Sequence, residues 1–135
     1  MKFLAIDLGE KRTGLAVGDD TTRIASPLMT IHASRVEDRL SQIDRAIREH
    51  RTDAIVVGLP VNMDGTEGEA ARKAREFGDC LASRFGLPVH MVDERLSTET
   101  ADAQLRDRGL TRKGKRARRD ALAAAAILNT FLTSL

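Results

Sequence analysis

The amino-acid sequence predicts an α/β fold, in which a five-stranded mixed sheet of three antiparallel strands, followed by alternating strands and helices, is flanked by helices. Two observations support this prediction. Short apolar runs with strand character occupy the first 31 residues, with no helical period between them. From residue 34 onward, apolar residues recur at helical spacing and alternate with two further short apolar runs. Strands first, and strand and helix in alternation afterwards, is the pattern of a mixed sheet covered by helices.

Each expected strand has its own signal. The first is uninterrupted in its apolar character and ends in Asp7, which is typical of a buried central strand. The third contains Pro27, which cannot donate a ladder hydrogen bond, so we expect it at an edge of the sheet. The fourth is apolar throughout and should be buried on both faces. The five expected strands cover residues 2–7, 13–17, 24–31, 54–58 and 88–92.

The expected helices follow from apolar periodicity and from capping residues. Capping boxes formed by Ser34 with Glu37 and by Thr66 with Glu69 predict the starts of the first two helices. Two more helices are expected over residues 97–108 and 121–132, and the second of these is apolar nearly all round, so it should pack against the sheet.

The length and composition favour one domain over residues 1–135, because 41% hydrophobic residues suffice for one sizeable core. No stretch of 18 uncharged apolar residues occurs, and no signal peptide is expected. Cys80 is the only cysteine, which excludes an intrachain disulfide and is interpreted as a small core side chain. We therefore expect a cytoplasmic protein.

The net charge of +2 hides a concentration of positive charge. Residues 106–119 contain eight basic side chains and a single acid, Asp107, whereas the remainder of the chain carries 14 basic and 19 acidic side chains. A solvated loop of an ordinary soluble protein is one interpretation. A basic arm that holds a polyanion is the other, and residues 110–117 are then expected to form a mobile loop without substrate.

Four carboxylates are placed where an apolar strand ends or an apolar helix begins: Asp7, Asp93, Glu94 and Asp120. Hard divalent cations such as Mg²⁺ take oxygen ligands, and one or two carboxylates per ion suffice when substrate phosphates complete the coordination shell. Together with the basic residues, these acids predict a metal-dependent nuclease.

Each carboxylate also has a plainer interpretation. Asp7 is also suited to cap a turn, and Asp120 to interact with the dipole of the helix that it begins. Asp93 and Glu94 are adjacent, so an extended backbone points them to opposite faces and only one of them can join Asp7; the other is expected to pair with Arg95 or a backbone amide.

Other residue types add little catalytic chemistry. The hairpin that follows Asp7 contains glycines and brings Lys11 or Arg12 within reach of a phosphate. His32, His50 and His90 lack ligand spacing, so no role in a site is expected of them. With no Trp and no Tyr in the chain, binding should depend on backbone phosphates and shape rather than on base stacking.

Four stretches of the sequence together resemble the YqgF (RuvX) family over essentially the whole chain. The first carries Asp7 and its glycine hairpin, the second Gly58 and the following Leu-Pro turn, the third Asp93 and Glu94, and the fourth Asp120. They are Ile-Asp-Leu-Gly-Glu-Lys-Arg-Thr-Gly-Leu-Ala-Val from residue 6, Val-Gly-Leu-Pro-Val-Asn-Met-Asp-Gly-Thr-Glu-Gly from residue 57, Val-Asp-Glu-Arg-Leu-Ser-Thr from residue 92 and Arg-Asp-Ala-Leu-Ala-Ala-Ala from residue 119.

The resemblance implies an RNase H-like fold and a hydrolase that trims the 5′ end of the small-subunit ribosomal RNA precursor, with Holliday junction resolution as the alternative activity. It matches Asp7 to the first catalytic acid, Glu94 with its neighbour Asp93 to the middle one, and Asp120 to the last. One departure concerns the fourth strand, which commonly ends in an acid in the wider superfamily and has Gly58 here. Asp64 is a distant substitute for that acid.

The expected mechanism is phosphodiester hydrolysis with two Mg²⁺ or Mn²⁺ ions. Asp7 is expected to contact both ions, and Glu94 and Asp120 one ion each. Basic side chains from the hairpin and from the basic run are expected to bind the nucleic acid: Lys11, Arg12, Arg112, Lys113, Lys115, Arg116, Arg118 and Arg119.

Three further functions remain open at this level. A Holliday junction resolvase would use the same acids in a symmetric dimer, because it must cut two strands. A non-catalytic nucleic-acid-binding protein would need neither the metal nor Asp7. ATP binding by the glycine hairpin is the least favoured, since a second lobe is missing. The expected partner is nucleic acid, either precursor ribosomal RNA or branched DNA. No membrane association is expected, and the protein is expected to be a monomer or a homodimer.

Overall fold

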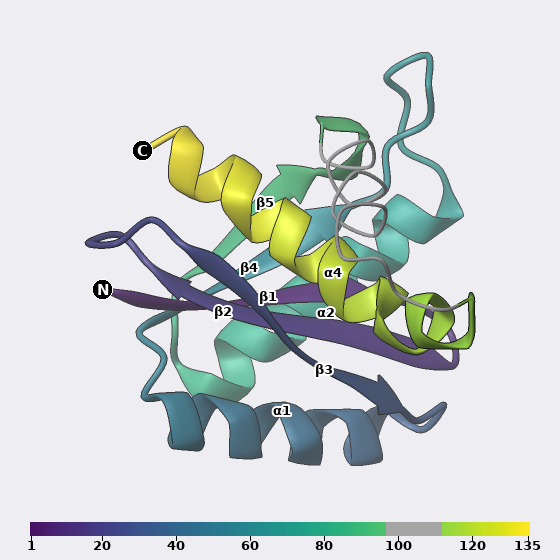
Figure 1. Ribbon diagram of the computed structural model, residues 1–135. Helices are drawn as coiled ribbons and strands as arrows, with labels where there is room; N and C mark the ends of the chain where they lie inside the picture. Colours follow the sequence, from purple (N-terminus) through teal and green to yellow (C-terminus); the bar gives the residue numbers. More distant parts are fainter. Residues whose placement is uncertain (97–111) are drawn as a thin grey trace.

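The computed structural model describes the backbone of residues 1–96 and 112–135, and the side chains of residues 1–96 and 119–135. Five strands form a single mixed sheet in the order β3-β2-β1-β4-β5 (Figure 1). The first three strands are antiparallel, whereas β4 runs parallel to both β1 and β5. The predicted fold class is therefore confirmed. The strands are β1 (Lys2–Leu8), β2 (Arg12–Asp19), β3 (Ala25–His32), β4 (Ala54–Leu59) and β5 (Val89–Asp93).

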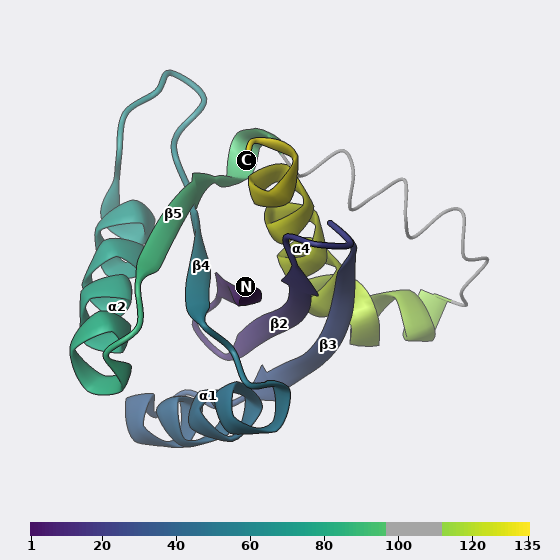
Figure 2. The same cartoon turned by 90° about the vertical axis from the view of Figure 1, so that its left-hand side faces the viewer.

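Helices cover both faces of the sheet (Figure 2). The helices α1 (Val36–His50) and α2 (Glu69–Phe85) pack on one face, and α4 (Arg112–Thr133) packs on the other. Alternation along β1 assigns its residues to these faces, because successive side chains of a strand point in opposite directions. Leu4 and Ile6 pack against α1 and α2, whereas Phe3 and Ala5 pack against α4.

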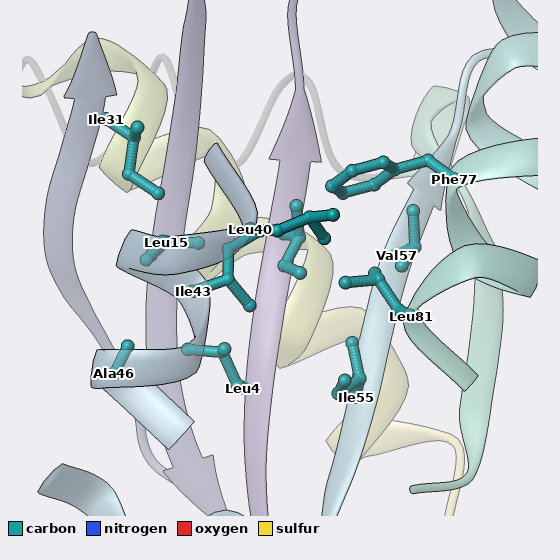
Figure 3. Close-up of a cluster of buried hydrophobic side chains, with 11 residues drawn as sticks. Leu4, Leu15, Ile31, Leu40, Ile43, Ala46, Ile55, Val57, Phe77 and Leu81 are labelled. Carbon is teal, nitrogen blue, oxygen red and sulfur yellow. The ribbon is translucent and has the colours of Figure 1, made fainter. Parts of the chain in front are cut away.

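The two cores differ in the size of their side chains. The core beneath α1 and α2 is built from large aliphatic residues and Phe77 (Figure 3). The core beneath α4 contains many alanines, including Ala5 and Ala16 of the sheet and Ala124 and Ala125 of the helix. Small side chains on both surfaces allow the helix and the sheet to approach closely, which matters for the placement of Asp120.

The edge position that Pro27 predicts for its strand is confirmed, since β3 lies at one edge of the sheet. The register between β2 and β3 shifts at Leu15 and Ala16, opposite Pro27. A bulge at an edge strand is one of the few positions in a sheet that tolerate proline, because no ladder hydrogen bond is lost.

The two predicted capping boxes are wrong. Arg35 and Gly68 are the N-cap residues of α1 and α2, and neither makes a side-chain capping hydrogen bond. Thr66 instead closes the preceding loop: its backbone N–H and its hydroxyl both donate to the Asp64 carboxylate, at 3.0 and 2.6 Å. Local hydrogen bonds of a threonine compete in this way with helix capping.

The last helix is longer than predicted. It begins at Arg112, so residues 112–117, expected as part of a mobile loop, are helical. Apart from Gly114, the residues of this segment are arginine, lysine and alanine, which have high helix propensity, and the segment continues directly into the alanine-rich part of α4. The helix predicted over residues 97–108 lies outside the described residues. In the described part of the chain, no helix has both the length and the apolar character needed to cross a membrane.

Candidate functional site

Three carboxylates from distant parts of the chain approach one another at the carboxyl end of β1 and β4. Asp7 belongs to β1, Glu94 begins the short 3₁₀ helix η1 (Glu94–Leu96) that follows β5, and Asp120 lies in α4. Asp7 alternates with Phe3 and Ala5, so its side chain lies on the α4 face of the sheet. The Asp7 carboxyl group interacts electrostatically with both Glu94 and Asp120.

Gly14 determines how closely α4 approaches Asp7. Gly14 is the antiparallel partner of Asp7, so a side chain there would lie on the same face of the sheet. A Cβ atom at Gly14 would overlap the backbone carbonyl of Asp120 and lie 2.9 Å from the nitrogen of Ala121. Only glycine lets the helix backbone rest on β2 at this point, and this close approach brings Asp120 beside Asp7.

Gly58 leaves the space that Glu94 fills. A Cβ atom at Gly58 would lie 2.5 Å from Oε1 and 2.9 Å from Cγ of Glu94. Gly58, the position where the resemblance led us to expect an acid, therefore has no side chain, and a carboxylate from the end of the neighbouring strand lies over it instead. The distant substitute Asp64 is engaged elsewhere, because its carboxylate accepts hydrogen bonds from Thr66.

Asp7 and Glu94 share a hydrogen bond, and the pKa of Asp7 is raised from 3.8 to about 9. Burial of the Asp7 carboxyl is the largest cause, followed by the hydrogen bond and the negative charge of Glu94, and then by the charge of Asp120. Two carboxylates this close cannot both ionise without a compensating cation. In the metal-free protein at neutral pH, Asp7 and Glu94 therefore share one proton in the hydrogen bond between them.

Asp93 is oriented away from this pair. Val92 packs on the α4 face, so alternation places Asp93 on the opposite side and Glu94 on the side of Asp7. The Asp93 carboxylate pairs with Arg95, whose Nη2 atom lies 2.7 Å from Oδ2, and this interaction lowers the pKa of Asp93. The Nη1 atom of Arg95 also donates to the carbonyl oxygens of Asn62 and Met63, at 3.3 and 3.4 Å.

Asp120 faces the basic hairpin that the sequence associates with phosphate binding. Its Oδ2 atom lies 3.4 Å from Nε of Arg12. A cavity of about 650 Å³ opens beside this pair and is lined by Gly9, Glu10, Lys11, Arg12, His32 and Asp120. His32 was not expected at a site, since only the register between β2 and β3 brings it opposite Arg12.

The donor set has the chemistry of a site for a hard cation, because all three side chains offer carboxylate oxygens. Among the described residues, however, no three Asp, Glu, His or Cys side chains are arranged to hold a metal ion as they stand. Asp7 and Glu94 are in contact, whereas Asp120 faces Arg12. Asp7, Glu94 and Asp120 are the groups that would hold a cation there, with Asp120 also close to Arg12.

Most of the predicted nucleic-acid contacts in the basic run cannot be compared with the structure. Arg119 is exposed near the start of the described part of α4, close in sequence to Asp120. The side chains of Arg112, Lys113, Lys115, Arg116 and Arg118 lie outside the described residues.

Comparison of the sequence with protein families gives a match over residues 1–134 to the family described as "RuvX: Holliday junction resolvase". Two relatives, from Anaeromyxobacter sp. (strain Fw109-5) and Dechloromonas aromatica (strain RCB), are each 46% identical to this chain. The alignments cover 98% and 97% of this chain and 96% and 90% of the relatives. Both relatives are named as candidate pre-16S rRNA nucleases.

Solved structures share the fold at low sequence identity. RuvC of T. thermophilus in complex with a Holliday junction substrate has a TM-score of 0.65 and 17% identity, over 99% of this chain and 95% of that one. The Fowlpox virus resolvase in complex with Holliday junction DNA has a TM-score of 0.58 and 9% identity, over 99% and 98%. The fold is thus the RNase H-like fold of these resolvases.

Proposed function

Because this chain belongs to the RuvX family of nucleases, we propose that it hydrolyses phosphodiester bonds of structured nucleic acid with divalent cations, and that a precursor of 16S ribosomal RNA is its substrate. The observation that carries this proposal is the convergence of Asp7, Glu94 and Asp120 on the α4 face of the sheet. The names of the relatives that are 46% identical support the RNA substrate.

The three carboxylates are the groups that would hold the cations, which we propose to be two Mg²⁺ or Mn²⁺ ions. Such ions lower the pKa of a bound water and stabilise the charge that develops on the leaving oxygen. The proton that Asp7 shares with Glu94 supports this assignment, because a site that cannot keep both groups ionised on its own is one where a cation would be bound.

The remaining residues act on the substrate and on the acids. Gly58 leaves room for Glu94, and Gly14 leaves room for the backbone of α4 at Asp120, so that the acids meet at one place. Arg95 holds Asp93 away from the site, and Asp93 therefore acts as a supporting residue rather than as a ligand. Lys11, Arg12 and the basic residues around Arg119 would bind phosphates on either side of the bond that is cut.

Holliday junction resolution is the second candidate, and the description of the matching family favours it. A resolvase must cut two strands at symmetric positions, so it requires a dimer with two sites. A monomer in solution, measured by light scattering, would favour the RNA substrate. We propose that the protein acts in the cytoplasm, where ribosomal RNA is processed.

Cleavage of two labelled substrates tests the proposal: a precursor ribosomal RNA 5′ segment and a four-way DNA junction, each with Mg²⁺, Mn²⁺ or a chelator. We expect metal-dependent cleavage of the RNA, reduced at least about a hundredfold by Asp7→Asn. Asp79→Asn is the matched control, since Asp79 is an exposed acid of α2. Cleavage of the junction alone would select the resolvase. Binding of either substrate without cleavage in any metal would identify a non-catalytic binding protein.

A further inference from the structure

The cavity beside Asp120 combines three hydrogen-bond donors, Arg12 and His32 from two strands and Lys11 from the turn before β2, and the acid Glu10 also lines it. Arg12 and His32 are directly paired across β2 and β3, so their side chains lie on the same face of the sheet, and Lys11 precedes Arg12. All three line the cavity of about 650 Å³, together with Asp120. The ion pair between Arg12 and Asp120 is loose, at 3.4 Å, and Arg12 is largely exposed, so its guanidinium is available to a stronger partner.

We propose that this cavity is a subsite for a phosphate of the substrate that is not itself cleaved, bound by Lys11, Arg12 and His32. The inference rests on the proposed function, because it takes the ligand to be nucleic acid. In the proposed function the reacting phosphate lies at Asp7 and Asp120. Because Asp120 also lines this cavity, the cavity is placed to take a neighbouring phosphate of the same strand. Phosphate oxygens accept hydrogen bonds from all three side-chain types.

Arg39 of α1 supports the subsite through hydrogen bonds to the backbone next to its residues. Its side chain is only 6% exposed, and no acid among the described residues forms an ion pair with it. Its Nη2 atom instead donates to the carbonyl oxygens of Gly9 at 3.1 Å, of Glu10 at 2.8 Å and of Ala33 at 2.9 Å. A buried charge without an acid is costly, so these three hydrogen bonds are needed to compensate it.

Two of these carbonyl oxygens belong to residues that line the cavity, and the third belongs to the residue next to His32. Gly9 and Glu10 form the turn that leads into Lys11 and Arg12, and Ala33 directly follows His32. One guanidinium group therefore fixes the ends of two strands relative to each other. Arg39 is a positioning residue of the subsite, since it touches the backbone that carries the phosphate contacts rather than the phosphate.

The test uses the RNA segment and the four-way junction as fluorescent probes, in chelator, so that binding is measured by anisotropy without cleavage. A single uncharged methylphosphonate linkage is moved along the strand from probe to probe. With the wild type, we expect one position at which the linkage weakens binding by about tenfold. In His32→Ala and in Arg12→Ala, affinity falls and the same linkage has less than about a twofold further effect, because the contact is already lost.

His50→Ala is the matched control, because His50 lies at the opposite end of the sheet, beside Lys2 and Thr52. This variant should bind as the wild type does, with the full effect of the linkage. Independent, multiplicative effects of the linkage and of His32→Ala would overturn the subsite. So would a His32→Ala variant with wild-type affinity.

Arg39→Met tests the positioning role, with Arg39→Lys as the variant to use where the first does not fold. We expect the linkage effect to shrink although Arg39 touches no phosphate. A role in stability alone would lower the melting temperature and leave the linkage effect intact, which would overturn the positioning role. If the wild type cleaves neither substrate but shows the linkage effect, the proposed function is overturned and the subsite stands. If the wild type cleaves a substrate but no linkage position weakens binding, the subsite alone is overturned.

Discussion

At the scale of single residues, the site is built around an unfavourable interaction. Asp7 is half-buried beside Glu94, and the two share a proton because both cannot be charged in the metal-free protein. The alternation of β1 and the absence of a side chain at Gly58 impose this contact. Functional sites commonly reduce stability in this way, since the arrangement that suits a ligand is strained without it.

The metal-free protein should therefore show a pH dependence that comes from Asp7. The pKa of Asp7 is about 9 in the folded protein and 3.8 as its ordinary value, so between these values the folded protein binds more protons than the unfolded chain. The free energy of unfolding then falls as pH rises through this window. We expect Asp7→Asn to be more stable than the wild type by about 1–2 kcal/mol near pH 8.

Urea denaturation in chelator, from about pH 5 to pH 9, measures this effect. The difference between Asp7→Asn and the wild type should grow as pH rises. Asp79→Asn, an exposed control on α2, should follow the wild-type curve. A difference that stays constant over this range would contradict the proton shared by Asp7 and Glu94.

A methyl group at Gly58 should disturb both catalysis and stability. The added Cβ would lie 2.5 Å from Oε1 of Glu94 and 2.5 Å from Cδ1 of the buried Ile127, so both side chains must move. A shift of about 1 Å in a catalytic group can lower the rate a hundredfold, so we expect a loss of this order in Gly58→Ala. Initial rates of cleavage measure it. Gly78→Ala serves as the control, because the nearest atom there is the sulfur of Met91 at 3.3 Å, in a flexible side chain. Equal rates for the two variants would exclude the role of Gly58.

At the scale of secondary-structure elements, the position of α4 decides whether the site exists. Its alanines meet the alanines of β1 and β2, and its backbone rests on Gly14. The capping boxes predicted for α1 and α2 show the limit of local patterns, because Thr66 finds its partner in Asp64 rather than at a helix start. Helix starts depend on such competition, whereas the apolar periodicity that predicts a helix does not.

Gly14→Ala should lower stability and activity together. The new Cβ would meet the backbone of Asp120 and Ala121, and a backbone cannot move aside as a side chain does. Overpacking of this kind costs about 1–3 kcal/mol or more, and it would move Asp120 away from Asp7. Urea denaturation and cleavage rates measure the two losses. Wild-type stability of this variant would show that α4 does not rest on Gly14.

At the scale of the whole molecule, charge is distributed unevenly along the chain. The eight basic residues between residues 106 and 119 precede Asp120, and the remainder of the chain is net acidic. A polyanion would therefore be attracted to the end of the molecule where α4 begins. The described basic residues of the hairpin, Lys11 and Arg12, lie at the same cavity as Asp120.

Removing charges from the basic run should change the salt dependence of binding. Each lost phosphate contact lowers the slope of log K against log salt by about 0.9 on a duplex, so Arg118→Ala with Arg119→Ala should lower it by about 1.8. Anisotropy titrations at several salt concentrations measure the slope. The control pair Arg45→Ala with Arg48→Ala removes two charges from the exposed side of α1. Equal slopes for both pairs and the wild type would remove the basic run from the binding surface.

The sequence by itself determined the fold class, the edge position of the strand that contains Pro27, and the carboxylates at the ends of strands. These features follow from periodicity and from proline's missing N–H, which act over a few neighbouring residues. The sequence also restricted Asp93 and Glu94 to opposite faces, without deciding which of them meets Asp7. Asp120, expected to begin a helix, lies inside α4 instead, because that helix already begins at Arg112.

Only the tertiary structure decided that Glu94, rather than Asp93, meets Asp7, and only the tertiary structure completed the site. Glu94 meets Asp7 because Val92, two residues before it, packs on the α4 face, and because Gly58 leaves a space above β4. His32 is placed beside Arg12 by the register of two strands, and Arg39 donates hydrogen bonds to the carbonyl oxygens of Gly9 and Ala33, which lie close to them in the chain. Such contacts link residues that are distant in the chain, so they depend on packing between elements rather than on any local pattern.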